Sequence, residues 1–201
     1  MINTIIFDMG NVLIDFRWRA LYEEMGLKGE KLERMAKATT LNPFWNEFDR
    51  GVLTDEEMLE GFIKADPGLE SELRTFFYER FSGILKAYDY SGQWLKELRD
   101  KGYKVLILSN FSEKALRECK DELKYMQEAD GAVISCKVKM IKPDEEIYRY
   151  LLEKYEVEPS KAVFIDDTAV NIEAAKRLKI NGILFENRQQ AVYELQKLGV
   201  N

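Results

Sequence analysis

Several polar residues follow short apolar runs at distant points of the chain and could form one reactive site. The runs at residues 3–8, 104–108 and 162–165 lead into carboxylates, a hydroxyl and an amide, namely Asp8, Ser109, Asn110, Asp166 and Asp167. Such runs are typical of strands buried in a parallel sheet, and ligands bind beyond the carboxyl ends of these strands. Lys142, just before an expected helix, could reach the same edge. We therefore expect these groups to meet.

This mixture of groups suits phosphoryl transfer assisted by a metal ion. Clustered carboxylates repel one another unless a cation is present, and an all-oxygen ligand set favours Mg²⁺. A metal held in this way also binds a phosphate oxygen and neutralises the charge that develops as the P–O bond breaks. Lys142 and Ser109 would donate to other oxygens, and Asp8 is placed to attack phosphorus and form an aspartyl-phosphate. Because the 201 residues include no histidine, Ser-His-Asp, Cys-His and histidine-based zinc sites are excluded.

The composition favours a small-molecule partner. The net charge of -6 disfavours nucleic acid or an anionic membrane surface as the main partner, because both need basic patches. No apolar run is long enough for a transmembrane helix, and the N-terminus lacks the pattern of a secretory signal. We expect a cytoplasmic monomer that acts on a small phosphorylated metabolite, with Cys119 and Cys136 reduced.

The pattern of elements predicts how these residues are positioned. Weaker strand patterns occur at residues 132–135 and 182–185, and helical patterns at residues 91–102, 144–155 and 171–178. The alternation predicts an α/β fold with a doubly wound parallel sheet. Residues 15–85 are predicted to be helical throughout, with turn or capping signals at Asn42-Pro43, Thr54–Glu57 and Asp66-Pro67-Gly68. We expect a core of residues 1–14 and 86–201, with a helical cap of residues 15–85 over the strand ends.

Four segments resemble the ordered motifs of haloacid dehalogenase-like hydrolases. They are F-D-M-G-N-V-L (7–13), L-I-L-S-N (106–110), I-K-P-D-E-E-I-Y (141–148) and F-I-D-D-T-A-V-N-I-E-A-A (164–175). The resemblance covers the whole chain and implies a Rossmann-like core with a cap after the first motif. The F-D-x-G-N-V opening and the stretch from Trp45 to Gly51 are similar to small sugar-phosphate phosphatases related to the phosphatase domain of epoxide hydrolases.

This resemblance implies a role for each matching residue. Asp8 would be the nucleophile and a metal ligand, with the carbonyl of Gly10 as another ligand. Asp167 is the expected direct ligand of the acidic pair, whereas Asp166 would act through water or by orienting Lys142. Asn171 falls where the family often places a supporting residue. The residues expected to bind phosphate or substrate are Asn11, Ser109, Asn110, Lys142, Trp45 and Arg50.

One position departs from the family pattern. Many family phosphatases carry an acid–base Asp two residues after the nucleophile, where this chain has Gly10. Such a group typically contributes about 10²–10⁴ in rate. A replacement acid, with Asp15 and Asp49 as candidates, would supply the proton. A leaving group that needs little protonation, such as that of a sugar 1-phosphate, would also fit.

Gly10 also supports a different class of function. The chain could be a catalytically weak binding or regulatory protein that keeps the phosphate pocket, although Asp8, Lys142 and the acidic pair argue for an enzyme. Two neighbouring reactions rank lower. A phosphomutase needs the proton-shuttling group that Gly10 lacks, and a haloacid dehalogenase needs no magnesium and hence no acidic pair.

Overall fold

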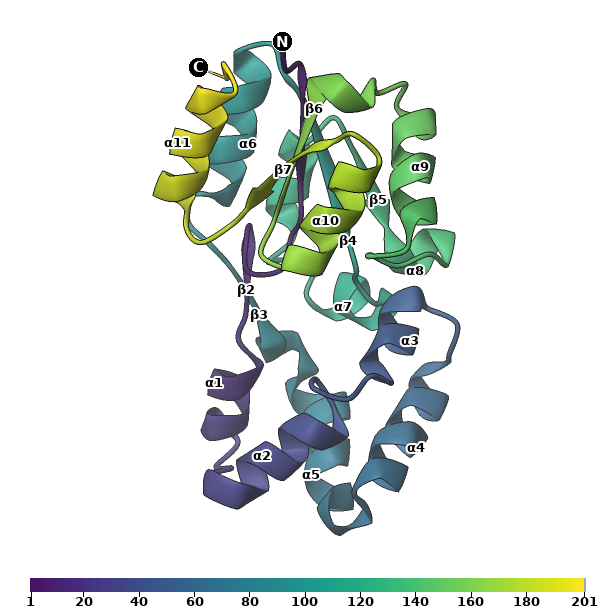
Figure 1. Cartoon of the computed structure of the whole chain (residues 1–201). Helices are drawn as coiled ribbons and strands as arrows, with labels where there is room; N and C mark the ends of the chain where they lie inside the picture. Colours follow the sequence, from purple (N-terminus) through teal and green to yellow (C-terminus); the bar gives the residue numbers. More distant parts are fainter. Residues whose placement is uncertain (201) are drawn as a thin grey trace.

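The computed structural model describes residues 1–200 and has a five-stranded parallel sheet with helices on both faces (Figure 1). The sheet order is β5-β4-β1-β6-β7, and each neighbouring pair is parallel. The strands are β1 (Thr4–Phe7), β4 (Lys104–Ser109), β5 (Gly131–Ile134), β6 (Ala162–Asp166) and β7 (Asn181–Leu184). The predicted α/β fold is confirmed, and each predicted strand is present.

Alternating side chains of the sheet enter two hydrophobic clusters. Ile5 and Phe7 of β1 pack with residues of α6 (Ser91–Asp100) and α11 (Arg188–Lys197) on one face. Ile6 packs on the other face with residues of α9 (Glu145–Lys154) and α10 (Ala169–Arg177). Successive side chains of β1 point to opposite faces of the sheet. Because helices cover both faces, all four residues of β1 are buried.

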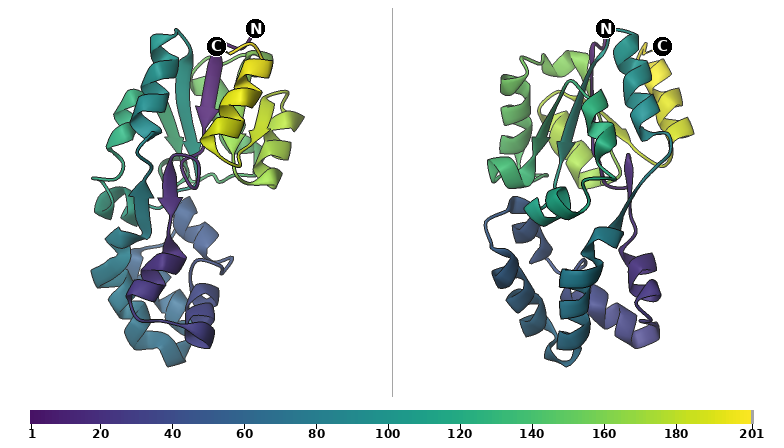
Figure 2. Two further views of the ribbon diagram at one scale, coloured as in Figure 1. Left: turned by 90° about the vertical axis from the view of Figure 1, so that its left-hand side faces the viewer. Right: turned by 180° about the vertical axis from the view of Figure 1, so that it is seen from behind.

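A helical region, residues 18–84, lies beyond the carboxyl ends of the strands (Figures 1 and 2). Its helices are α1 (Trp18–Glu24), α2 (Gly29–Ala38), α3 (Trp45–Arg50), α4 (Asp55–Ala65) and α5 (Glu70–Thr75). Thr54 and Glu57 form the predicted capping box at the start of α4. Within residues 1–200, no helix combines the length and apolar character needed to cross a bilayer.

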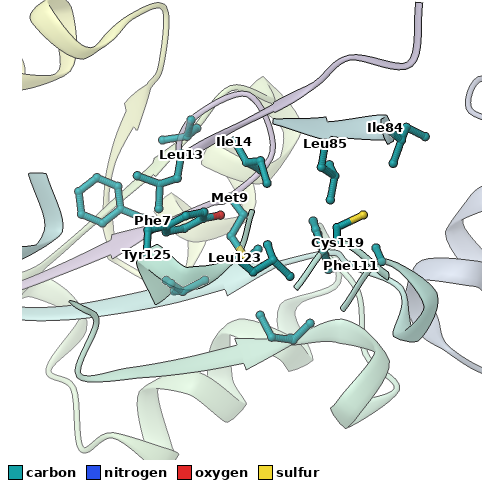
Figure 3. Close-up of a cluster of buried hydrophobic side chains, with 14 of the residues drawn as sticks. Phe7, Met9, Leu13, Ile14, Ile84, Leu85, Phe111, Cys119, Leu123 and Tyr125 are labelled. Atoms are coloured by element: carbon teal, nitrogen blue, oxygen red, sulfur yellow. The ribbon is translucent and has the colours of Figure 1, made fainter. Parts of the chain in front are cut away.

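Two short strands connect the helical region to the sheet. β2 (Ile14–Phe16) pairs antiparallel with β3 (Leu85–Ala87), so the prediction of helix throughout residues 15–85 was wrong at both ends. Side chains from this ribbon join the buried cluster of Figure 3, where Ile14 and Leu85 lie near Met9 and Leu123. The ribbon therefore ties the segment after β1 to the hydrophobic core. The division into two domains remains a prediction.

Several shorter elements complete the chain. Two further helices, α7 (Glu113–Glu118) and α8 (Ser135–Val138), lie near the strand ends. Single turns of 3₁₀ or π helix occupy Pro67–Leu69, Phe76–Arg80, Phe81–Ile84, Lys124–Glu128 and Pro159–Lys161.

Replacing Thr54 with alanine should lower the free energy of unfolding by about 1 kcal/mol, because the backbone N–H of Glu57 loses its hydroxyl acceptor. Urea denaturation of the purified protein measures this change. Thr54→Ser is the matched control, since it keeps the hydroxyl and should stay close to the wild type. Equal losses in the two variants would contradict a capping role.

Candidate active site

The ammonium group of Lys142 lies between two buried carboxylates at the sheet edge. Its Nζ is 2.7 Å from Asp8 Oδ1 and 2.6 Å from Asp166 Oδ2. The parallel register places Phe7 of β1 beside Ile165 of β6, so the next residues, Asp8 and Asp166, come together. Burial alone would lower the pKa of Lys142, but the two carboxylates outweigh it and raise the pKa. Lys142 therefore stays charged and joins the ends of two neighbouring strands.

Asp8 has the surroundings of a nucleophile that is held in place. Ser109, at the end of β4, donates a hydrogen bond of 2.7 Å to the Oδ1 atom that also contacts Lys142. Burial raises the pKa of Asp8 to about 6, Lys142 opposes this change, and Asp166 adds to it. The carboxylate form of Asp8 is favoured by any further cation that enters the site.

The two acidic residues after β6 have different surroundings. Asp166 is fully buried, and both of its oxygens accept hydrogen bonds, from Lys142 Nζ, from Asn171 Nδ2 at 3.1 Å and from the backbone N–H of Thr168 at 2.8 Å. Asp167 is only half-buried and lines the cleft described below. The geometry thus supports Asp166 as the residue that orients Lys142. Each oxygen of Asp167 accepts one hydrogen bond, from Asn11 or Thr168, and Asp167 borders the cleft, so it is the acid that a ligand in the cleft can reach.

The donor set of this site fits a hard divalent cation. Asp8, Asp166 and Asp167 each offer one carboxylate oxygen, and these oxygens lie within 4.8 Å of one another. With all three ionised, Lys142 leaves two negative charges uncompensated in a largely buried place, which is costly without a cation. Mg²⁺ prefers such oxygens. Asp8, Asp167 and the carbonyl of Gly10 are the groups that would hold it.

Two asparagines predicted to bind phosphate hold other site residues in place. Asn110 donates from Nδ2 to the carbonyl of Lys142 at 2.9 Å and accepts from the Lys142 N–H at 2.8 Å. Asn11, with a left-handed φ of 56°, donates to Asp167 Oδ2 at 2.8 Å. Both also border the cleft. Through these hydrogen bonds, Asn110 positions Lys142 and Asn11 positions Asp167. Direct contact of either asparagine with phosphate remains a prediction.

A cleft of about 210 Å³ lies where the strand ends face the helical region. Asp8, Gly10 and Asp167 form part of its polar floor, while much of the remaining wall is apolar, from Phe16, Trp45, Phe81, Leu85 and Phe111. Trp45 thus forms part of the cleft wall, and its contact with a substrate remains a prediction. Arg50 does not line the cleft, because its guanidinium lies 3.6 Å from Asp144 and 3.7 Å from Glu47.

The structure adds residues that hold the loop after Asp8. Tyr90 Oη donates to the carbonyl of Val12 at 2.8 Å, and Ser91 Oγ donates to that of Leu13 at 2.5 Å. Ser91 is the first residue of α6, and its hydroxyl bonds to Leu13 rather than capping the helix. Both contacts join residues 78 positions apart, so no local pattern could reveal them.

Asp49 of α3 also reaches the cleft and has an unusual protonation equilibrium. Burial and the nearby charge of Asp8 raise its pKa to about 7, against the opposing effects of Lys142 and a hydrogen bond from Trp45. Asp15, the other candidate acid, belongs to β2 and does not line the cleft. At neutral pH, Asp49 can therefore hold or release a proton in the cleft that Asp8 also lines.

Known proteins share both the sequence pattern and the fold. A family model described as haloacid dehalogenase-like hydrolase matches residues 2–179. A sesquiterpene phosphatase from Aspergillus oryzae is 24% identical over 96% of this chain and 94% of its own length. An (S)-2-haloacid dehalogenase from Burkholderia cepacia is 25% identical over 92% of this chain and 82% of its own. The share of a curated relative's length that the chain spans varies from 15% to 94%.

The solved structures include an enzyme of the same family from Bacteroides thetaiotaomicron in complex with magnesium and inorganic phosphate. It matches with a TM-score of 0.72 at 22% identity, over 92% of this chain and 95% of that one. This likeness concerns the fold.

Asp49→Asn should remove part of the pH dependence of stability. Because the folded state raises the pKa of Asp49 from 3.8 to about 7, it binds this proton more tightly than the unfolded state does. The free energy of unfolding therefore falls as the pH rises through this interval. As the pH rises from about 4 to about 8, the free energy of unfolding of the variant should increase by about 1–3 kcal/mol relative to that of the wild type. This range is smaller than the full pKa shift implies, because Asp49 is partly exposed to solvent.

Urea denaturation without added metal, at several pH values, measures this difference. Glu47→Gln on the same helix is the matched control and should follow the wild type. Parallel pH profiles for Asp49→Asn and the wild type would show that Asp49 is not held in its protonated form.

Proposed function

The chain belongs to the haloacid dehalogenase-like hydrolases, and from this premise we propose that it is a magnesium-dependent phosphatase that acts on small phosphomonoesters through an aspartyl-phosphate at Asp8. The observation that carries this proposal is the contact of Asp8 with both Lys142 and Ser109, next to an acidic pair of which Asp167 borders the cleft. We place the reaction in the cytoplasm, on a monomer.

Each residue has a task that follows from its contacts. A carboxylate oxygen of Asp8 attacks phosphorus, the bond to the leaving oxygen breaks, and water later hydrolyses the aspartyl-phosphate. Lys142 and Ser109, both 2.7 Å from Asp8 Oδ1, are placed to donate to the oxygens of the transferring group. Asn110 fixes the backbone of Lys142, and Asp166 fixes its ammonium group. Bound Mg²⁺ would neutralise charge on the phosphoryl oxygens.

The helical region would act as a cap that excludes water and selects the leaving group. Trp45 of α3 and Phe81 supply aromatic surface to the cleft, and Phe111 adds to it from the core side. Such walls favour a leaving group with an apolar or flat face. The relative from Aspergillus oryzae, named a sesquiterpene phosphatase, is consistent with an apolar leaving group. A sugar phosphate, including a sugar 1-phosphate, stays the other candidate because sugar rings also pack on aromatic side chains.

A second candidate function is binding of a phosphorylated metabolite with little turnover. Gly10 favours it, because the usual proton shuttle is absent there. A dehalogenase reaction is disfavoured by the acidic pair, although one relative carries that name. Equilibrium binding of inorganic phosphate combined with undetectable hydrolysis would establish the binding function.

Asp8→Asn should abolish phosphate release from a panel of aryl, isoprenoid and sugar monophosphates, because the amide cannot attack phosphorus. Chelation with EDTA should abolish release by the wild type, and added Mg²⁺ should restore it. Release that survives the substitution, or that ignores the chelator, would contradict the proposal.

Asp167→Asn should raise the Mg²⁺ concentration needed for half-maximal activity by roughly 10-fold or more, because a charged ligand becomes a neutral one. A magnesium titration of phosphate release measures this shift. Asp144→Asn removes an acid outside the cleft and should leave the titration unchanged. An unshifted titration for Asp167→Asn would exclude this residue as a direct ligand.

A further inference from the structure

Asp49, on α3 of the helical region, and Asp8, directly after β1, both line the cleft. The negative charge of Asp8 contributes to the raised pKa of Asp49. Asp8 Oδ1 is already bound by Ser109 and Lys142, whereas within residues 1–200 no hydrogen bond joins the Asp49 carboxyl group to Asp8. The leaving group of a phosphoryl ester attacked by Asp8 would occupy the cleft that Asp49 also lines.

Asp49 is held firmly over the strand ends. Ser135 Oγ donates to the Asp49 carbonyl at 2.5 Å and accepts from the Phe111 N–H at 2.8 Å, which fastens α3 to the segment after β4. Gly51, with φ 69°, ends α3 so close to α8 that a Cβ atom there would lie 2.8 Å from the Cβ of Cys136. Glycine is thus required for this close approach. The carboxyl group of Asp49 sits on an anchored turn.

The neighbours of Asp49 keep its proton available at neutral pH. Asp8 faces it from β1, Lys142 from the segment before α9, Cys136 from α8, and Trp45 from its own helix. Burial and Asp8 favour the neutral acid, while Lys142 and Trp45 favour the carboxylate, and the pKa is about 7. A group balanced in this way can donate a proton in one step and accept one in the next.

Gly10 occupies the position where many family phosphatases carry such a group, and there is room for a side chain at this position. A Cβ atom built on Gly10 meets nothing within 4 Å, so the absence of an acid there is not imposed by packing. The cleft thus has space for a carboxyl group on the floor and already has one on the opposite wall.

We propose that Asp49 is the general acid and base of the reaction, supplied by the helical region in place of a side chain at Gly10. This inference rests on the proposed function. As Asp8 bonds to phosphorus and the P–O bond of the ester breaks, the Asp49 carboxylic acid gives its proton to the leaving oxygen, and an alcohol departs. The Asp49 carboxylate then takes a proton from the water that attacks phosphorus, and the Asp8 carboxylate and inorganic phosphate are released. A leaving group of low basicity, as in a sugar 1-phosphate, is then not required.

The test compares an alkyl phosphate with 4-nitrophenyl phosphate, whose leaving group departs without a proton. For Asp49→Asn, kcat/KM should fall by about 10²–10⁴ with the alkyl phosphate, and by less than about 10-fold with 4-nitrophenyl phosphate. The ratio kcat/KM reports the first chemical step for both substrates. Adding Gly10→Asp to Asp49→Asn should restore at least about 10-fold of the activity on the alkyl phosphate.

Glu47→Gln is the matched control, because Glu47 lies on the same helix but pairs with Arg50 outside the cleft. It should leave both substrates unaffected. Equal losses of Asp49→Asn on the two substrates, or no loss on either, would overturn the proton-transfer role while the phosphatase function stands. Failure of the wild type to release phosphate from 4-nitrophenyl phosphate with Mg²⁺ present would overturn the proposed function itself.

Discussion

The ion pairs of Lys142 with Asp8 and Asp166 are the interaction on which the rest of the site depends. Within residues 1–200, Lys142 is the only cation paired with these carboxylates, and its side chain is almost fully buried. A buried carboxylate without a partner would take up a proton and lose its nucleophilic character. A lysine without these partners would lose its charge in the same surroundings. The fold therefore has to bring both acids and the lysine to one point. The parallel register of β1 and β6 brings the two acids together, and two hydrogen bonds with Asn110 hold the backbone of Lys142 beside them.

The sequence predicted the sheet and the floor of the site well, and the reason is physical. Apolar runs buried on both faces are distinctive, and parallel strands must place their carboxyl ends together, so Asp8, Ser109 and Asp166 had to meet. The β2–β3 ribbon could not be foreseen, because three residues carry no readable period. The partners of Asn110 and Asn11 depend on side-chain direction, which spacing does not give. Spacing also did not show the direction of the Arg50 side chain, whose guanidinium lies near Asp144 and Glu47 rather than in the cleft lining.

The cleft is assembled from two regions that contribute different chemistry. The sheet edge has the charges and hydrogen-bond donors that a phosphoryl group would need, whereas the helical region provides aromatic surface and one carboxyl group, that of Asp49. This division between the two regions gives a reason for the absence of an acidic side chain at Gly10. With an acid on the opposite wall, a second acid beside the nucleophile would add negative charge to a place that already has an excess. Substrate choice and proton transfer would then both depend on how α3 docks against Ser135.

The most direct test of the account is the fate of Asp8 during one turnover. Enzyme in excess over a phosphomonoester, with Mg²⁺ and ¹⁸O-labelled water, is quenched in acid, and the Asp8 peptide and released phosphate are weighed by mass spectrometry. The account predicts a transient phosphoryl group on the Asp8 peptide and ¹⁸O in the phosphate, because water attacks phosphorus. An Asp8 peptide that is never phosphorylated, or ¹⁸O found in the Asp8 carboxylate, would contradict it.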